Sequence, residues 1–384
     1  MEEEMEILRE YFNEGYTYDV ILDMLSTHHD INMSLRNLKA RLKELGLRRR
    51  GDYSSISEVR RAIFSELRGP GQMFGYRTMW LTLKQKHGLH VKRETVMRML
   101  RELNPLGTLS RTRRRFVRRT YHSMGPNYVW HVDGYDKLKP FGIGISGCID
   151  GFSRKIMWLK CGPTNKNPEV IKNYFIDCIR NVGVIPMRLR TDCGTENGLM
   201  ASAQCTLRHD HSDYYAGDKS HMFGSSMSNQ RIESWWSIFR KQRTQFWMGL
   251  FADLRDHGHF NGTHEHQCLL RFCFMTVLQA DLVECVHLWN RHRIRPSRLA
   301  SCPGGIPNEL YSLPHRFGSR DCGFALDEAS THIFQDGHQT EDPCGDPDIN
   351  DYFQQAMQQY GLQHPDTWQA ASQLLITLKG IAGL

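Results

Sequence analysis

The feature that most constrains this fold is a change in hydrophobic period at Tyr128, where helical spacing gives way to the alternation typical of strands. Three extended segments follow: YVWHVDGY at 128–135, FGIGISGCID at 141–150 and KIMWLKC at 155–161. The motif DGFSR supplies a turn between the second and third segments. Pro168 then begins a helical pattern that Asn167 or Thr164 can cap, and a short strand, MRLRT, comes after it. This order predicts an α/β layered domain.

Helical patterns precede this domain. Residues 1–50 hold three of them, and the clearest begins after Ser34, a good N-cap residue. Its apolar stripe consists of Leu35, Leu38, Leu42 and Leu45. Residues 51–105 hold a second trihelical pattern, which includes GYRTMWLTLKQKHGL. We expect two tandem helix-turn-helix units, at least one of which contacts DNA. A small helical bundle that binds another partner would show the same stripes, so this alternative stays open.

Residues 106–126 form a predicted linker that is dominated by arginine and lacks a stable apolar face. The arginines expected to bind DNA there are Arg111, Arg113, Arg114, Arg115, Arg118 and Arg119. The run can be a solvated charge run or a nuclear-import signal. It can also be an arm that tracks phosphates, whose affinity for DNA falls steeply with salt. These interpretations are compatible, and the net charge of +7 favours an anionic partner only mildly.

Three acidic residues stand where an α/β sheet can gather side chains. Asp133 lies inside the first extended segment, where an acid among apolar neighbours is unusual. Asp192 follows MRLRT at the start of a glycine-containing loop, and Glu233 lies near the start of the helical pattern NQRIESWWSIFRKQR. Phosphodiester transfer can use two divalent ions about 3.5–4 Å apart. Because hard Mg²⁺ or Mn²⁺ prefers carboxylate ligands, Asp133, Asp192 and Glu233 are candidate metal ligands and catalytic residues. Periodicity alone does not make this case, since an isolated acidic residue more often caps a helix or forms a salt bridge.

The helix that carries the glutamate has two distinct faces. On a helical wheel Glu233 shares a face with Asn229 and Arg240. The predicted buried face consists of Ile232, Trp235 and Phe239. We expect Asn229, Arg240 and the following Lys241 to bind DNA beside the metal site.

The local motifs resemble the integrase core of retroviruses, retrotransposons and related DNA transposons. WHVDGY is similar to that family's first-aspartate strand, TDCGTEN to its second-aspartate motif, and SMSNQRIESWW to its glutamate helix. LWNRHRIRPSRL and GGIPNELY resemble the segment that closes many integrase cores, so the resemblance covers roughly residues 125–311. The chain looks most like stand-alone integrase-core proteins of eukaryotic transposons, such as Ginger-like elements. The GYRTMW unit is similar to the helix-turn-helix of some bacterial insertion-sequence transposases.

The resemblance implies a ribonuclease-H-like core at residues 127–312, with a mixed five-stranded sheet and flanking helices. It implies that Asp133 bridges two Mg²⁺ or Mn²⁺ ions while Asp192 and Glu233 each hold one. The basic residue seven positions after the glutamate, Arg240, contacts DNA in the family. Cleaving transposon ends and joining them to target DNA involves two ends at once, so a homo-oligomer is expected.

Some features depart from the family pattern. The interval from Asp192 to Glu233, 233 minus 192 or 41 positions, is slightly longer than in retroviral integrases. The pattern H-x₃-H…C-x₂-C does not precede the core. Two alternatives therefore stay open. One is a domesticated, catalytically inactive DNA-binding or regulatory protein, and the other is a ribonuclease-H-like nuclease that cuts without joining.

Other candidate groups have simpler interpretations. Asp136, Asp150 and Glu196 suit a strand end, a turn and a loop, and we expect structural roles for them. The stretch 257–273 has a zinc-like composition: His257, His259, His264, His266, Cys268 and Cys273. Its spacing fits no closed tetrahedral module, and its cysteines lie in an apolar helical pattern, so we favour core packing over zinc.

The remaining features bear on location. The 11 cysteines include no CxxC pair and predict free thiols in a reducing compartment. No apolar run approaches 18 residues, so we expect no membrane insertion. We expect a nuclear location. Residues 313–384 are predicted to form a polar loop followed by a helical segment from Ile349 to Leu384.

Overall fold

The computed structural model describes residues 2–47, 53–105, 121–224, 229–296, 301–327 and 342–384. The arginine-rich run from Arg111 to Arg119 lies outside these residues, so its predicted phosphate contacts stay a prediction. The chain forms two compact units, here called the helical unit and the core unit. The helical unit comprises Met1–Thr120 and Asn290–Arg320, and the core unit comprises Tyr121–Trp289 and Asp321–Leu384. The finer domain boundaries expected from the sequence also stay predictions.

The helical unit contains both predicted trihelical patterns. Its helices are α1 (Glu2–Glu14), α2 (Tyr18–His29), α3 (Leu35–Glu44), α4 (Ile56–Leu67), α5 (Tyr76–Gln85), α6 (Arg93–Leu103) and α13 (Pro307–Ser312). Ser34 caps α3 as predicted, because its side chain accepts a hydrogen bond from the Asn37 amide at 3.2 Å. Leu38 and Leu42 are buried, but Leu35 is 45% exposed. The predicted stripe is therefore wrong at Leu35, which is the first residue of the helix.

The core unit contains a mixed five-stranded sheet, which confirms the predicted ribonuclease-H-like architecture. Its strands are β1 (Trp130–Tyr135), β2 (Gly144–Asp150), β3 (Ile156–Gly162), β5 (Leu189–Thr191) and β6 (His221–Phe223), in the order β3-β2-β1-β5-β6. β1 pairs antiparallel with β2, and β2 with β3, as expected for consecutive hairpins. β5 pairs in parallel with both β1 and β6, and α8 (Pro168–Val182) precedes it in the chain. Strand β6 was not identified from the sequence.

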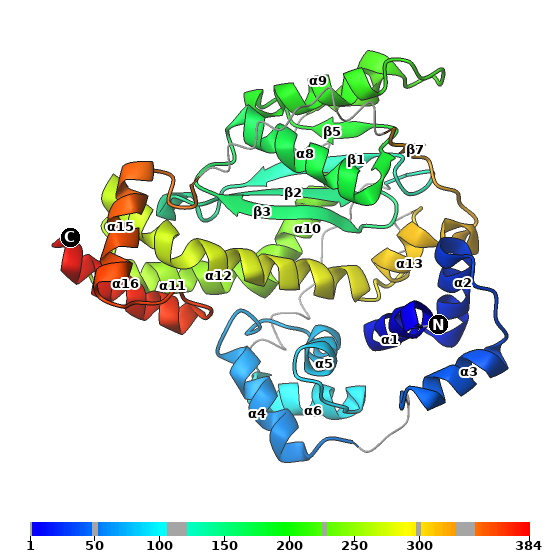
Figure 1. Cartoon of the computed structure of the whole chain (residues 1–384), viewed down its shortest axis with the longest axis horizontal. Helices are drawn as coiled ribbons and strands as arrows, with labels where there is room; N and C mark the ends of the chain where they lie inside the picture. Colours follow the sequence, from blue (N-terminus) through cyan, green and yellow to red (C-terminus); the bar gives the residue numbers. More distant parts are fainter. Residues whose placement is uncertain (1, 48–52, 106–120, 225–228, 297–300, 328–341) are drawn as a thin grey trace. The chain divides into compact units, whose positions relative to one another are not determined.

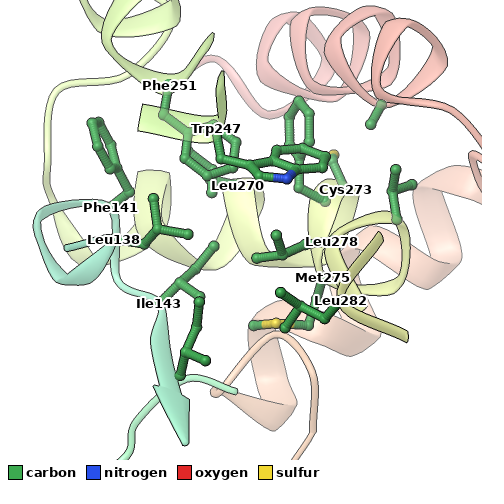
Figure 2. Packing of buried hydrophobic residues seen from close by; sticks show 14 of the residues in the cluster. Leu138, Phe141, Ile143, Trp247, Phe251, Leu270, Cys273, Met275, Leu278 and Leu282 are labelled. Atoms are coloured by element: carbon green, nitrogen blue, oxygen red, sulfur yellow. The ribbon is translucent and has the colours of Figure 1, made fainter. Parts of the chain in front are cut away.

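Helices cover both faces of this sheet (Figure 1). Besides α8, the core unit contains the α-helices α9 (Gly198–Leu207), α10 (Gln230–Phe239), α11 (Gln245–Asp256), α12 (His264–Arg291), α15 (Pro347–Gln359) and α16 (Trp368–Ala382). On one face Trp130 and Val132 of β1 pack with α8 and α9. On the other face Tyr135 packs with α10, α11 and α12. Figure 2 shows part of this second core, where Trp247 of α11 lies beside Leu270 and Cys273 of α12.

Segments from the end of the chain complete the core unit. α15 and α16 bury Phe353 and Leu378 against the cluster that contains α12, as the amphipathic pattern near the C-terminus predicted. The stretch expected to be a loop also contributes β7 (Phe324–Ala325), which pairs antiparallel with β4 (Val184–Ile185). Across the described ranges, no helix combines the length and apolarity needed to cross a membrane.

Candidate active site

Asp133 lies in β1 beside helix α10. Its partner across the sheet is Gly147 of β2, where a Cβ atom would come within 2.7 Å of the Trp236 ring. Glycine thus allows the indole to pack directly on the sheet next to the aspartate. Trp236 Nε1 donates a hydrogen bond to Asp133 Oδ2 at 2.8 Å. Burial raises the pKa of Asp133 to about 7, although this hydrogen bond to the carboxylate opposes the rise.

Asp192 comes directly after β5, the parallel neighbour of β1. In that pairing His131 lies beside Arg190, so Asp133 and Asp192 each stand two positions further along their strands. Parallel strands that run in register bring such positions to the same edge of the sheet. Asn197 Nδ2 donates a hydrogen bond to Asp192 Oδ1 at 2.8 Å. The carboxylate is therefore held in a fixed orientation.

Glu233 lies in the first turn of α10, a position where the helix dipole favours a negative charge. Asn229, which precedes the helix and is 1% exposed, ties it to β1. Its Nδ2 donates to the Val132 carbonyl at 2.8 Å, and its Oδ1 lies 2.7 Å from His131 Nδ1. Because Val132 immediately precedes Asp133, these bonds fix the start of α10 relative to the first aspartate.

The three carboxylates interact electrostatically with one another. Burial is the largest cause of the raised pKa of Asp133, and the negative charges of Glu233 and Asp192 raise it further. Burial raises the pKa of Glu233, and Asp192 adds to this effect. Charge interactions fall with distance and are weak in water, so this coupling requires close, partly desolvated carboxylates. The structure thus brings together the three residues singled out in the sequence, from β1, from the end of β5 and from α10.

The donor set suits a divalent cation. Neighbouring carboxylate charges raise the pKa of Asp133 and of Glu233, so the trio forms a negative site that Mg²⁺ or Mn²⁺ would neutralise with its preferred oxygen ligands. Among the described residues, their ligand oxygens do not all lie within 4.8 Å of one another, as expected for like charges that repel. The residues present therefore fit the predicted metal ions by the chemistry of their oxygen donors.

The residues predicted to contact DNA occupy two environments. Arg240 and Lys241 are exposed at the end of α10, in the short π-helical segment Arg240–Thr244. The predicted buried face of α10 is confirmed, since its apolar residues are all at most 2% exposed: Ile232, Trp235 and Phe239. Asn229 differs, because both ends of its amide are engaged inside the protein. Asn229 therefore holds the start of α10 in place. Its side-chain amide does not face outward in this structure, so the predicted contact with DNA is not supported.

Two neighbours of the site were not recognised as such from the sequence. Trp236 is buried beside the sheet, and its indole NH reaches Asp133. His131 alternates with the apolar residues of β1, and its ring lies between Asn229 and Tyr121, 2.7 Å from each partner. Burial lowers the pKa of His131 to about 3, so the ring is neutral at physiological pH. The hydrogen-bonding side of a buried aromatic residue has no signature in hydrophobic periodicity.

The other acidic residues have structural partners, as the sequence interpretation expected. Asp150 is fully buried and accepts hydrogen bonds from the amide and hydroxyl of Ser153 at 2.7 and 2.6 Å, which closes the DGFSR turn. Asp136 accepts a hydrogen bond from an asparagine side chain, and Glu196 forms an ion pair with a lysine. The carboxylates of Asp150, Asp136 and Glu196 therefore have hydrogen-bond or ion-pair partners within the fold, which fits structural roles.

Comparison with known families agrees with this geometry. The family model described as "Integrase core domain" matches residues 120–311, a span that contains β1, β5 and α10 with all three carboxylates. No curated protein matches the chain.

Proposed function

The chain belongs to the integrase core domain family, and on this premise we propose that it cleaves DNA and joins DNA ends by metal-dependent phosphodiester transfer. Nucleic-acid processing of the integrase or transposase type is the general activity of the family. The single observation that carries the specific proposal is the placement of the trio within the matched region: Asp133 and Asp192 stand at one edge of neighbouring parallel strands, and Glu233 lies on the helix that is tied to β1. A site of this kind can serve both cutting and joining, because both are attacks of an oxygen nucleophile on phosphorus.

In the proposed reaction the three carboxylates hold two Mg²⁺ or Mn²⁺ ions, which would stabilise phosphate charge and make a hydroxyl group more acidic. For cleavage, a water oxygen attacks phosphorus, the bond to the 3′ oxygen breaks, and that oxygen takes up a proton. For joining, the freed 3′-hydroxyl loses its proton and attacks a target phosphate, and the target strand breaks at that phosphate. The products balance without an oxidant or an energy source.

The surrounding residues have positioning roles in this proposal. Trp236 would orient Asp133 through its indole NH, and Asn197 would orient Asp192. Arg240 and Lys241, exposed where α10 ends, would neutralise phosphates of the bound strand. A site assembled from rigid strands and a helix suits a reaction that needs accurate placement of two DNA segments.

The helical unit has a basic pocket that fits a DNA backbone. Its positively charged lining residues are Arg77, Lys84, Arg93, Arg291, Arg293 and Arg295. The pKa of His292, which lines the same pocket, is sensitive to the positive charges around it. Burial, followed by the charges of Arg77, Arg93 and Arg295, lowers its pKa to about 4. Burial disfavours charge of either sign, but the contribution of the three arginines marks a positive potential, which favours the negative charge of phosphate.

Replacing two of these cations should weaken DNA binding in a salt-dependent way. The double variant Arg77→Gln/Arg295→Gln should lower the slope of log affinity against log salt by about 2, because each phosphate contact contributes roughly 0.9. Affinity should fall to a similar extent on unrelated DNA sequences. Fluorescence anisotropy over a salt series measures both effects. As a matched control, Arg60→Gln removes an exposed arginine of α4 that pairs with Glu102 outside this pocket, and its slope should match wild type.

Removing one metal ligand should separate binding from chemistry. Asp192→Asn keeps the shape of the side chain and an oxygen for the Asn197 bond, but removes the charge that a metal ion requires. We expect loss of Mn²⁺-dependent joining of labelled DNA ends by at least about 1,000-fold, with unchanged DNA affinity. If wild type binds DNA but neither cuts nor joins it, the chain is a domesticated DNA-binding protein. Cut products that are never joined would identify a nuclease.

Joining two ends to one target suggests an assembly larger than one chain, and a nuclear location fits this substrate; both are part of the proposal. Light scattering of the protein on paired end duplexes should show at least two chains per complex. A single chain on paired ends would count against the strand-transfer assembly.

A further inference from the structure

We propose that His264, Cys268 and Asp346 form a zinc site in the core unit, separate from the carboxylate trio and beyond the proposed end-joining activity. Within the described part of the chain, they are the one group of three whose ligand atoms all lie within 4.8 Å of one another. His264 and Cys268 are four residues apart at the start of α12, so they share a face of the helix. Asp346 comes from the segment that leads into α15.

The donor atoms are arranged almost as a tetrahedral zinc ion requires. His264 Nε2 lies 3.5 Å from Cys268 Sγ. Zinc bonded to nitrogen at about 2.0 Å and to sulfur at about 2.3 Å keeps these two atoms roughly 3.5 Å apart. Asp346 Oδ2 lies 2.8 Å from His264 Nε2, and an ion would widen this pair by about 0.5 Å. The nitrogen and sulfur already have the right spacing, and the oxygen lies within 4.8 Å of both.

The backbone that carries Asp346 is shaped for this approach. Gly345 has a φ of +79°, a conformation in which other residues are strained, and its amide bonds to the Asp342 carbonyl at 2.7 Å. This turn sets Asp346 at the N-cap of α15, where Oδ1 accepts a hydrogen bond from the Ile349 amide at 3.2 Å. Oδ2 is left to face His264. One carboxylate oxygen thus caps the helix while the other is available as a ligand.

The surroundings favour a sulfur-containing metal site. Arg271 Nη2 donates to Cys268 Sγ at 3.2 Å, which stabilises negative charge on that sulfur, and its Nε holds the Cys344 carbonyl at 2.6 Å. The Cys344 thiol is fully buried and donates a hydrogen bond to the Cys268 backbone carbonyl at 3.5 Å, so it supports the backbone of the cluster. Thiolate with imidazole selects Zn²⁺, whereas the carboxylate trio suits Mg²⁺ or Mn²⁺.

The sequence interpretation favoured core packing over zinc for the 257–273 stretch, because the local spacing fitted no module. The fold changes the comparison. It adds Asp346, which lies far along the chain, to the i, i+4 pair of α12. Cys268 and Cys273 both belong to the apolar cluster, as predicted, since their exposed fractions are 0% and 1%.

Zinc content of the purified full chain tests this proposal. After growth in zinc-supplemented medium and gel filtration, wild type should carry about one zinc ion per chain by mass spectrometry. Asp346→Asn and His264→Gln should each lower the zinc affinity by at least about tenfold. Asparagine can still cap α15, so loss of zinc from Asp346→Asn would not arise from unfolding of that helix. His257→Gln, an exposed histidine that bonds the Asp253 carbonyl, is the matched control and should keep its zinc.

Cobalt substitution identifies the ligands independently of any DNA reaction. A sulfur-to-cobalt charge-transfer band should appear in wild type, survive in Cys193→Ser, and vanish in Cys268→Ser. Cys193 is the exposed thiol next to Asp192, so this pair of variants separates the two sites. Zinc-free wild type, or equal zinc in wild type and Asp346→Asn, would overturn the proposal and leave the cluster as a hydrogen-bonded clasp. Because neither assay uses DNA, its failure is distinguishable from failure of the proposed end-joining function.

Discussion

Asp133→Asn should stabilise the folded protein and abolish its end-joining activity. Burial and the charges of Glu233 and Asp192 raise the pKa of Asp133 to about 7, so the ionised carboxylate destabilises the native state. Asparagine removes that charge and keeps an oxygen to accept the Trp236 hydrogen bond. We expect a gain of about 2 kcal/mol, roughly half of what the shift alone would give, since the side chain is partly exposed and screened. The melting temperature should rise by roughly 4–8 °C.

The pH dependence of this gain follows from the direction of the shift. In the unfolded chain Asp133 ionises near its model value of 3.8, and in the folded chain it ionises at about 7. Below pH 4 the residue is neutral in both states, so variant and wild type should have similar stability. Between pH 4 and pH 7 the wild type loses stability as the pH rises, because unfolding releases the proton. The advantage of asparagine should therefore grow over this range and stay constant above it.

Thermal melts at pH 5 and pH 8, with and without Mn²⁺, check the prediction. Added Mn²⁺ should raise the melting temperature of wild type and leave Asp133→Asn nearly unchanged, because bound metal stabilises only the protein that holds it. Asp136→Asn is the matched control on the same strand end, and it should show no gain. Equal melting temperatures for wild type and Asp133→Asn at pH 8 would contradict a strained carboxylate cluster. The end-joining loss in Asp133→Asn should be at least about 1,000-fold.

Local sequence was enough to predict most of the core unit. Alternation identified the three antiparallel strands, and the proline-led pattern identified α8, because such periods reflect which side chains each face buries. The trio was predicted in sequence order because each acid sits in a recognisable local motif. The short strand β6 was missed, since HMF offers only 3 residues and its pairing with β5 depends on distant parts of the chain.

The supporting contacts around both sites could not be predicted. The hydrogen bond from Trp236 to Asp133 joins residues 103 positions apart, and the approach of Asp346 to His264 joins residues 82 positions apart. Nothing in the local sequence encodes either contact. The amphipathic patterns say which side of an element is buried. They do not say which polar atom on that side meets which partner, and these meetings decide what a site can bind.

Arg243→Met should be the most destabilising single change in the segment that follows the glutamate helix. In the sequence this residue belongs to the basic run RKQR, yet it is 2% exposed. Its guanidinium bonds to Asp281 Oδ1, and Nη2 reaches Glu284 Oε1 at 3.3 Å. Removing the cation leaves two acids of α12 without their buried counter-charge, which costs about 3–5 kcal/mol. Urea unfolding followed by tryptophan fluorescence measures the loss.

The same experiment distinguishes a buried charge pair from a merely basic surface. Arg255→Met, at an exposed pair with Asp256 on α11, should change stability by less than about 0.5 kcal/mol. Adding Asp281→Asn to Arg243→Met should restore part of the lost stability, because one unpaired charge is removed while Trp247 Nε1 keeps an oxygen partner. A loss below about 1 kcal/mol in Arg243→Met would mean that the acids are solvated. In the folded protein Arg243, in the π-helical segment after α10, bonds to two acids of α12 and so ties α10 and Glu233 to that helix. A loss this small would mean that these bonds do not anchor α10.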